Sequence, residues 1–147
     1  MNKHITISQA KNAVYAAKSA GLRVGAFFII GYPGESNVTV LDTVRFASSL
    51  PLDYMSFTLP YPIPGTPLYE RVKDKGVAID DWEEPKNYHL IRHKLLYASG
   101  FSETKLKFAI GKAHAQFYGR KHLGNKGYDV FCKPLERLTD FAFEIIR

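Results

Sequence analysis

The chain's 147 residues are 46% hydrophobic and 23% charged, which suits one globular domain or part of one and excludes a disordered tail or a fibre. The single cysteine excludes an internal disulfide, and alone it cannot hold a structural zinc ion or an iron–sulfur cluster, so we expect a reducing, cytoplasmic setting. The net charge of +6 would permit weak binding to a polyanion, and no apolar run reaches the roughly 18 residues of a membrane span.

The first patterned segment predicts a helix. Over residues 6–20, apolar side chains recur at three- and four-residue spacing, and Thr6 with Gln9 has the pattern of a capping box. Gly21 stands where a left-handed C-terminal cap is expected. Residues 23–30 are almost continuously apolar, which predicts a strand covered on both faces, as in a parallel sheet.

A second helix and a second strand follow. Residues 31–34 break the first strand, and Ser36 or Asn37 then caps a helix that ends near residue 50. Its apolar stripe consists of Val40, Leu41, Val44 and Ala47. Residues 53–59 alternate between apolar and polar, which is typical of a strand with unlike faces, and the prolines from residue 60 onward end it. This order of elements predicts an α/β fold with two parallel strands and flanking helices.

The remainder predicts helices. A short one covers residues 68–75, an acidic loop covers 78–87, and further helices cover 88–98, 102–120 and, after a glycine-bearing loop, 135–146. Ser102 is the expected cap of the helix over residues 102–120. The apolar face of that helix consists of Leu106, Ala109, Ile110, Ala113 and Phe117.

Both irregular loops follow the carboxyl end of a strand, where ligands gather in βα architectures. If the strands are parallel, residues 31–35 and 60–67 share one rim of the sheet. Glycines permit a close backbone approach and prolines hold the loops rigid, which suits a preorganised surface for a flat ligand. The alternative is that these loops are tight connections that only close the sheet.

These loops resemble those of a known family. The run KSAGLRVGAFFIIGYPGE at residues 18–35, followed by PIPGTPLY at residues 62–69, resembles the second half of a radical S-adenosylmethionine enzyme. The segments DWE at 81–83 and FYGR at 117–120 resemble the C-terminal extension of the cobalamin-binding subclass. That subclass includes radical methyltransferases and the anaerobic oxidative cyclase of magnesium-protoporphyrin ester. The resemblance covers about residues 5–120.

The resemblance implies that the chain is a fragment of a larger enzyme. Residues 1–76 would form an incomplete (β/α) barrel segment with the fifth and sixth strands, and residues 77–147 a mainly helical C-terminal extension. The family's CxxxCxxC loop, which binds a [4Fe–4S] cluster, is absent, and a cobalamin domain would lie upstream. We therefore expect the parent to be an oxidoreductase or transferase, and the fragment alone to be inactive. Its expected partners are the missing N-terminal half and a small-molecule substrate.

By this resemblance, the adenine of S-adenosylmethionine packs on the ends of both strands. Ile29 and Gly31 would supply an apolar wall and a close backbone approach. Glu35 follows Gly31 by one residue more than in the family's motif, which leaves its role between a cofactor contact and a carboxylate that stabilises a helix N-terminus. The resemblance assigns no catalytic or metal-binding residue to this chain.

The second strand would meet the edge of the adenine through its main chain. The residues concerned are Phe57, Thr58, Leu59 and Tyr61. If the alternation holds, Ser56 and Thr58 face the barrel lumen, whereas the apolar residues pack outward on helices. Phe57 would then contribute only its backbone.

Two other groups of residues suggest weaker alternatives. His89 and His93, spaced i, i+4 on an expected helix, could bind a divalent metal ion, although surface histidines beside an acidic loop are commoner. A basic set interleaved with aromatic residues could make the chain a free-standing module for nucleic acid or another polyanion, although a solvated helix face is favoured. This set consists of Lys105, Lys107, Lys112, Arg120, Lys121, Lys126 and Lys133.

A half barrel would also expose an apolar strand edge. A second copy in a homodimer, a swapped element or the chain's own helices would then have to cover that edge.

Overall fold

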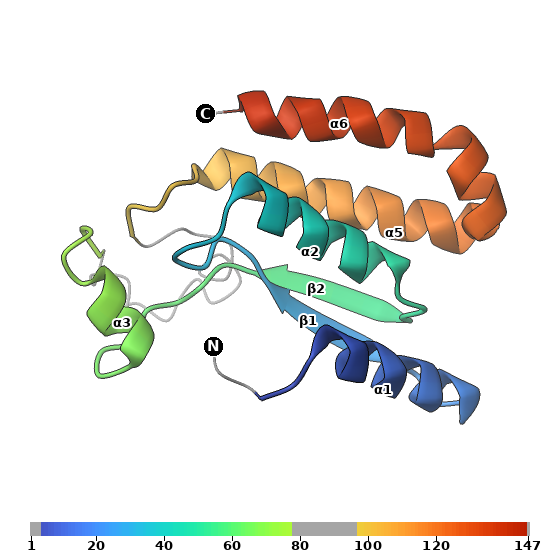
Figure 1. Cartoon of the computed structure of the whole chain (residues 1–147), viewed down its shortest axis with the longest axis horizontal. Coiled ribbons are helices and arrows are strands. Elements are labelled where there is room, and N and C mark those ends of the chain that lie inside the picture. The colour runs from blue at the N-terminus through green and yellow to red at the C-terminus, as the bar shows by residue number, and fades with distance from the viewer. Residues whose placement is uncertain (1–3, 78–96, 147) are drawn as a thin grey trace, which may run out of the picture.

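The computed structural model describes residues 4–77 and 97–146. In chain order the elements are α1 (Ile7–Ser19), β1 (Gly25–Ile29), α2 (Asn37–Ser49), β2 (Tyr54–Thr58), α3 (Pro67–Val72), α5 (Glu103–Phe131) and α6 (Lys133–Ile145). Figure 1 shows α2 and α5 lying over the sheet, with α6 farther out against α5. None of the described helices is long and apolar enough to cross a membrane.

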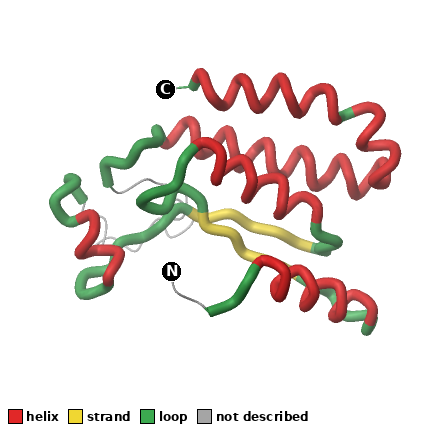
Figure 2. The backbone as a smooth tube through the Cα atoms, in the orientation of Figure 1, coloured by secondary structure: helices red, strands yellow, loops and turns green. Residues whose placement is uncertain are grey.

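The two strands are parallel, as predicted. Gly25 lies opposite Tyr54 and Ile29 lies opposite Thr58, and α2 connects the strands. The strand arrows in Figure 1 point the same way, and Figure 2 shows the two strands side by side, so that their carboxyl ends meet at one edge of the sheet. The loops that follow the strands therefore begin at the same edge.

The core lies between the sheet and the helices. In β2 and the residue after it, Met55, Phe57 and Leu59 are buried, whereas Ser56 and Thr58 are half-buried on the opposite face. The alternation predicted for this strand is therefore confirmed. The predicted stripe of α2 is buried in full, and on α5 the predicted face is buried apart from Ile110, which packs at the edge of the core. One core thus joins residues on both sides of the predicted boundary at residue 76.

Local capping follows the predictions closely. Thr6 Oγ1 accepts from the Gln9 backbone N–H at 3.1 Å, and Gln9 Oε1 accepts from the Thr6 N–H at 2.8 Å, so the capping box is formed. Of the two candidates for α2, Ser36 is the cap and Asn37 is the first helical residue. Gly21 has φ 77°, as expected for a left-handed residue after a helix.

The prediction that β1 is covered on both faces is wrong for the described part of the chain. Phe28 packs against Phe46 and Phe57, but Phe27 points to the opposite face and is 72% exposed. Its ring contacts Tyr54 edge-to-face, with ring centroids 6.0 Å apart. The helices α2 and α5 cover only one face of the sheet. The apolar side chains on the other face of β1 are therefore not buried by the described residues.

The glycine-bearing loop predicted between residues 120 and 135 is wrong in its length. Helix α5 continues to Phe131, with a kink at Gly124, where φ is 68° and ψ is 166°. This one glycine, at a positive φ that favours glycine, separates two helical segments without a longer loop. The predicted acidic loop at 78–87, most of the helix at 88–98, the DWE segment, and the pair His89 and His93 lie outside the described residues.

A three-helix ionic junction fixes α6 to the rest of the fold. The Asp140 carboxylate forms an ion pair with Lys112 Nζ at 2.8 Å and accepts a hydrogen bond from Arg45 Nη2, also at 2.8 Å. Lys112 is almost fully buried, with a side chain only 3% exposed, and it also donates to the Glu136 carbonyl at 3.1 Å. Burial alone would raise the pKa of Asp140, but its interactions with the Lys112 and Arg45 cations reverse this and hold that pKa below its usual value.

Replacing Asp140 with asparagine is expected to lower the free energy of unfolding at pH 7 by about 1–3 kcal/mol, because Lys112 would stay buried without its counter-charge. A carboxylate whose pKa is lowered by folding contributes all of its stability above the unfolded value of about 3.9 and loses it as the pH falls further. Urea unfolding at pH 7 and pH 3 should therefore show a smaller loss of stability on acidification in Asp140→Asn than in the wild type.

Asp42→Asn is the matched control for this prediction. Asp42 also pairs with Arg45, at 3.0 Å, but its side chain is 63% exposed. An exposed pair contributes little, so this change should cost less than about 1 kcal/mol. Equal losses in the two variants would contradict a special role for Asp140.

Candidate functional site

A cavity of about 670 Å³ lies at the carboxyl ends of the two strands. Four residues of the predicted adenine site line it: Ile29, Thr58, Leu59 and Tyr61. The other lining residues are Tyr32, Pro60, Ile63, Thr66, Pro67, Leu68 and Arg71. The loop after β1, the proline-rich loop after β2 and helix α3 therefore form its walls.

The cavity is suited to a flat and largely apolar ligand. Its volume falls within the range of roughly 300–1,000 Å³ typical of small-molecule sites. Aliphatic side chains, two tyrosines and two prolines form most of the lining, and Arg71 is the one charged residue among the described residues that line it. Helix α3 brings Arg71 there, because Thr66 caps the helix at Tyr69 N–H and Pro67 occupies its first position.

Phe57 takes a different position from the other predicted site residues of β2. Its side chain is 2% exposed and stacks on Phe28 with ring centroids 5.2 Å apart. The edge of the His114 ring, from α5, contacts it at a centroid distance of 6.2 Å. The side chain therefore belongs to the core, as predicted, and a contact of the Phe57 backbone with a ligand stays a prediction.

Glu35 closes the loop after β1 on itself. Its Oε2 accepts from the Gly31 N–H at 2.6 Å and from the Tyr32 N–H at 2.9 Å. Burial raises the pKa of Glu35, and these two donors lower it again only in part. The structure thus gives Glu35 a third role, beside the two left open by the sequence. It holds the loop that carries Tyr32 into the cavity wall.

Gly31 is required by a contact within the chain. Its φ is +84°, and a Cβ atom there would lie 2.6 Å from Leu106 Cδ1. Its carbonyl accepts a hydrogen bond from the Tyr97 hydroxyl at 2.8 Å. The sequence predicted a close backbone approach at Gly31, and the described contact is with helix α5. Gly31 and Glu35 are not among the described residues that line the cavity, and a contact of either with a ligand stays a prediction.

Tyr97 supports the loop beside this cavity, and the sequence did not indicate it. It is buried, with 4% exposure, and it ties the segment before α5 to the loop after β1. Burial and the nearby negative charge of Glu35 raise the pKa of Tyr97, so its hydroxyl keeps the proton that it donates. The contact spans 66 residues of sequence, and no local pattern points to it.

The basic set does not form the continuous surface considered from the sequence. Lys105 and Lys112 are buried, with 7% and 6% exposure, and Lys105 Nζ lies 4.9 Å from the centroid of the Phe143 ring. Lys107 pairs with Glu103, and Arg120 pairs with Glu136 at 3.3 Å. These positive charges are therefore largely buried or paired with carboxylates within the fold.

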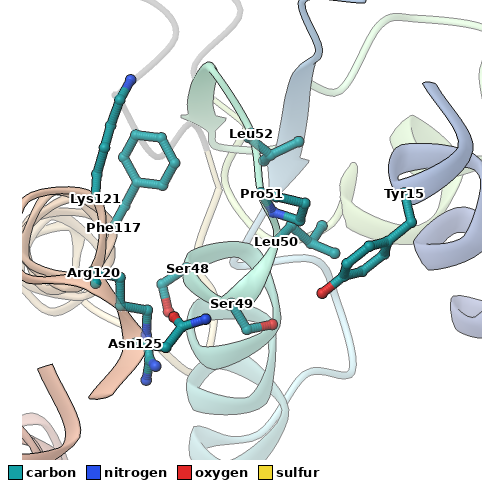
Figure 3. A pocket seen from close by; sticks show the side chains of 11 residues that line it. Tyr15, Ser48, Ser49, Leu50, Pro51, Leu52, Phe117, Arg120, Lys121 and Asn125 are labelled. Atoms are coloured by element: carbon teal, nitrogen blue, oxygen red, sulfur yellow. The ribbon is translucent and has the colours of Figure 1, made fainter. Parts of the chain in front are cut away.

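A second, smaller cavity of about 320 Å³ lies at the opposite end of the sheet (Figure 3). It lies between Tyr15 of α1, the end of α2 with the following residues 50–52, and the α5 residues around Asn125. Residues 50–52 lead directly into β2, so this cavity lies at the amino end of that strand, whereas in βα architectures ligands bind at the carboxyl end. The larger cavity is therefore the better candidate.

No family model matches the chain, but individual relatives do. The chain is 33% identical over 121 residues to an uncharacterized methyltransferase of Pyrococcus horikoshii, a match that covers 82% of this chain and 26% of that protein. It is 25% identical over 122 residues to the anaerobic magnesium-protoporphyrin IX monomethyl ester cyclase of Cereibacter sphaeroides, covering 83% and 19%. This chain is a homologue of such methyltransferases and cyclases.

A third relative strengthens the relationship. The bacteriochlorophyllide d C-12(1)-methyltransferase of Chlorobaculum tepidum is 31% identical over 68 residues, which cover 46% of this chain. The homology agrees with the two kinds of enzyme that the sequence resembles. The chain spans between 15% and 26% of the length of these relatives, so the activity of a whole enzyme is a matter for proposal.

Proposed function

We propose that the chain supplies part of the S-adenosylmethionine site of a radical enzyme of the cyclase or methyltransferase type. The observation that carries the proposal is the cavity at the carboxyl ends of β1 and β2, which contains four of the seven residues assigned to the adenine. In such enzymes the cofactor, once an iron–sulfur cluster has donated one electron to its sulfonium, would supply the radical that abstracts a hydrogen atom from the substrate. The contribution of this chain is to bind the adenine and shape the pocket.

The residues present fit the adenine end of the cofactor. Adenine is a flat ring with a polar edge, and Ile29 and Leu59 offer apolar contact in the cavity wall. The strand pairing ends at Thr58, so Leu59, Pro60 and Tyr61 belong to the loop that forms the cavity wall. This geometry supports adenine packing against the side chains.

The residues present do not fit a [4Fe–4S] cluster. Such a cluster needs several thiolate ligands, and the chain has one cysteine, Cys132, which lies between α5 and α6. In this proposal, a segment outside the chain holds the cluster, and an upstream domain holds cobalamin. The chain is then a C-terminal fragment that has no activity alone.

The exposed face of the sheet supports the partial-barrel part of the proposal. Phe27 and Tyr54 are 72% and 55% exposed on the face opposite the helices, beside Ile29 of the cavity. In a (β/α) barrel this face would line the lumen, and the remaining strands would pair with the free edges of β1 and β2. The missing half, or a second copy in its absence, would then cover apolar surface that is otherwise in water.

The coding sequence upstream of Met1 provides the direct test of the fragment proposal. An in-frame segment with the pattern CxxxCxxC is expected there. An upstream region that encodes no such segment would overturn the assignment to a radical enzyme.

A titration of the chain with 5′-methylthioadenosine, followed by amide NMR shifts, tests the adenine site. A ligand concentration of about 1 mM detects binding with a free energy of about 4 kcal/mol, and shifts are expected for the amides of residues 29–32, 58, 59 and 61. Ile29→Asn should weaken this binding. Phe27→Asn is the matched control, because Phe27 lies on the same face of β1 as Ile29. It should not weaken the binding, because Phe27 is not among the described residues that line the cavity.

Shifts confined to the cavity of Figure 3, or none at all, would count against the adenine site. The basic-module alternative makes a different prediction, namely RNA retained at about 50 mM salt and released steeply as salt rises.

A further inference from the structure

Arg71 places an exposed positive charge in the wall of an apolar cavity. It lines the cavity at the strand ends together with Ile63 and Leu68. Among the described residues it has no ion-pair partner, and the neighbouring carboxylate of Glu70 pairs with Lys73 at 2.7 Å. Within residues 4–77 and 97–146, the guanidinium is therefore available to a ligand.

A guanidinium in such a wall favours one class of ligand group. Arginine stays charged at all ordinary pH values, and its planar set of donors matches the two oxygens of a carboxylate. The walls beside it are aromatic and aliphatic, with Tyr32 and Tyr61 among them. The Thr66 hydroxyl, also in the wall, donates to the Ile63 carbonyl at 2.6 Å, so the charge of Arg71 dominates recognition at this end.

We propose that the cavity binds a planar, largely apolar molecule that carries an acidic group, and that Arg71 binds this acid. The inference rests on the proposed function in taking this cavity as the place where cofactor and substrate meet. The acid belongs to the substrate or to the methionyl part of the cofactor, and the chemistry at Arg71 is the same in both cases.

A pair of fluorescent probes tests the inference. 8-Anilinonaphthalene-1-sulfonate is flat, apolar and anionic, and N-phenyl-1-naphthylamine has the same rings without the acid. In Arg71→Gln the anionic probe should bind about tenfold more weakly, as expected when a hydrogen bond to a charged group is removed, whereas the neutral probe should change less than about twofold. Arg71→Lys should lie between the two, because it keeps the charge but loses the paired donors.

Lys75→Gln is the matched control variant. It removes one positive charge close to α3, and Lys75 is not among the described residues that line the cavity. It should leave the affinity for both probes unchanged. Equal weakening of the anionic probe in Arg71→Gln and Lys75→Gln, or no weakening in Arg71→Gln, would overturn the inference.

Displacement of the anionic probe distinguishes the two sources of the acid. If Arg71 binds the cofactor's carboxylate, Arg71→Gln should weaken displacement by S-adenosylmethionine but not by 5′-methylthioadenosine, which lacks that carboxylate. If Arg71 binds a substrate acid, neither should change. Failure of both nucleosides to bind the wild type would overturn the proposed function while leaving a probe site that depends on Arg71.

Discussion

Alanine at position 31 is expected to lower the free energy of unfolding by about 2–5 kcal/mol. A residue with a Cβ atom at φ +84° carries about 1–2 kcal/mol of backbone strain. The added methyl group would also lie 2.6 Å from Leu106 Cδ1, and overpacking of this kind costs about 1–3 kcal/mol. Urea unfolding of Gly31→Ala measures the sum.

Gly21→Ala separates the two contributions. Gly21 has a similar φ of +77°, but no atom lies within 4 Å of the Cβ position there. This control should show only the strain, about 1–2 kcal/mol. If both variants lose the same stability, Leu106 moves aside freely, and the close approach of α5 to the loop is not a constraint on residue 31.

Truncation of Phe57 to alanine is expected to cost about 3–5 kcal/mol, which is the usual range for a buried phenylalanine. Its side chain is 2% exposed and packs between Phe28 of β1 and His114 of α5, so little can collapse into the cavity left behind. For a chain of this length, each kcal/mol shifts the melting temperature by about 2–4 °C. Thermal unfolding should therefore show a fall of roughly 6–20 °C.

Phe27→Ala is the matched control for this prediction. It removes the same side chain from the neighbouring strand, but at a position that is 72% exposed. For the monomeric chain the expected loss is below about 1 kcal/mol, mostly from the edge-to-face contact with Tyr54. A loss as large as that of Phe57→Ala would mean that the face carrying Phe27 is covered in solution, for example by a second copy of the chain.

The elements that depend on nearby residues could be predicted from the sequence. The capping box of Thr6 and Gln9 and the cap at Ser36 satisfy helix ends with groups three residues away, so their pattern is visible in a short window. The alternation of β2 is equally local, because successive side chains point to opposite faces. Together with the parallel pairing, these features place both loops at the same edge, where four predicted site residues line the cavity.

The features that depend on distant residues could not be predicted in this way. Leu106 excludes a Cβ atom at Gly31, and Tyr97 binds the carbonyl of the same residue, but neither contact leaves a local pattern. Gly124 signals a loop by residue type, yet the helix resumes directly after it. From the sequence, Arg71 is an ordinary surface residue of a short helix. Its position in the cavity wall follows only from the placement of α3 in the structure.

The junction at Asp140 has a consequence for the order of folding. The contact between Arg45 and Asp140 closes a loop of 95 residues, whereas β1, α2 and β2 assemble from residues that are close in sequence. Closing the longer loop costs more entropy before any contact compensates for it. We therefore expect the β1–α2–β2 unit to form early and α6 to dock late, so that weakening the junction speeds unfolding far more than it slows folding.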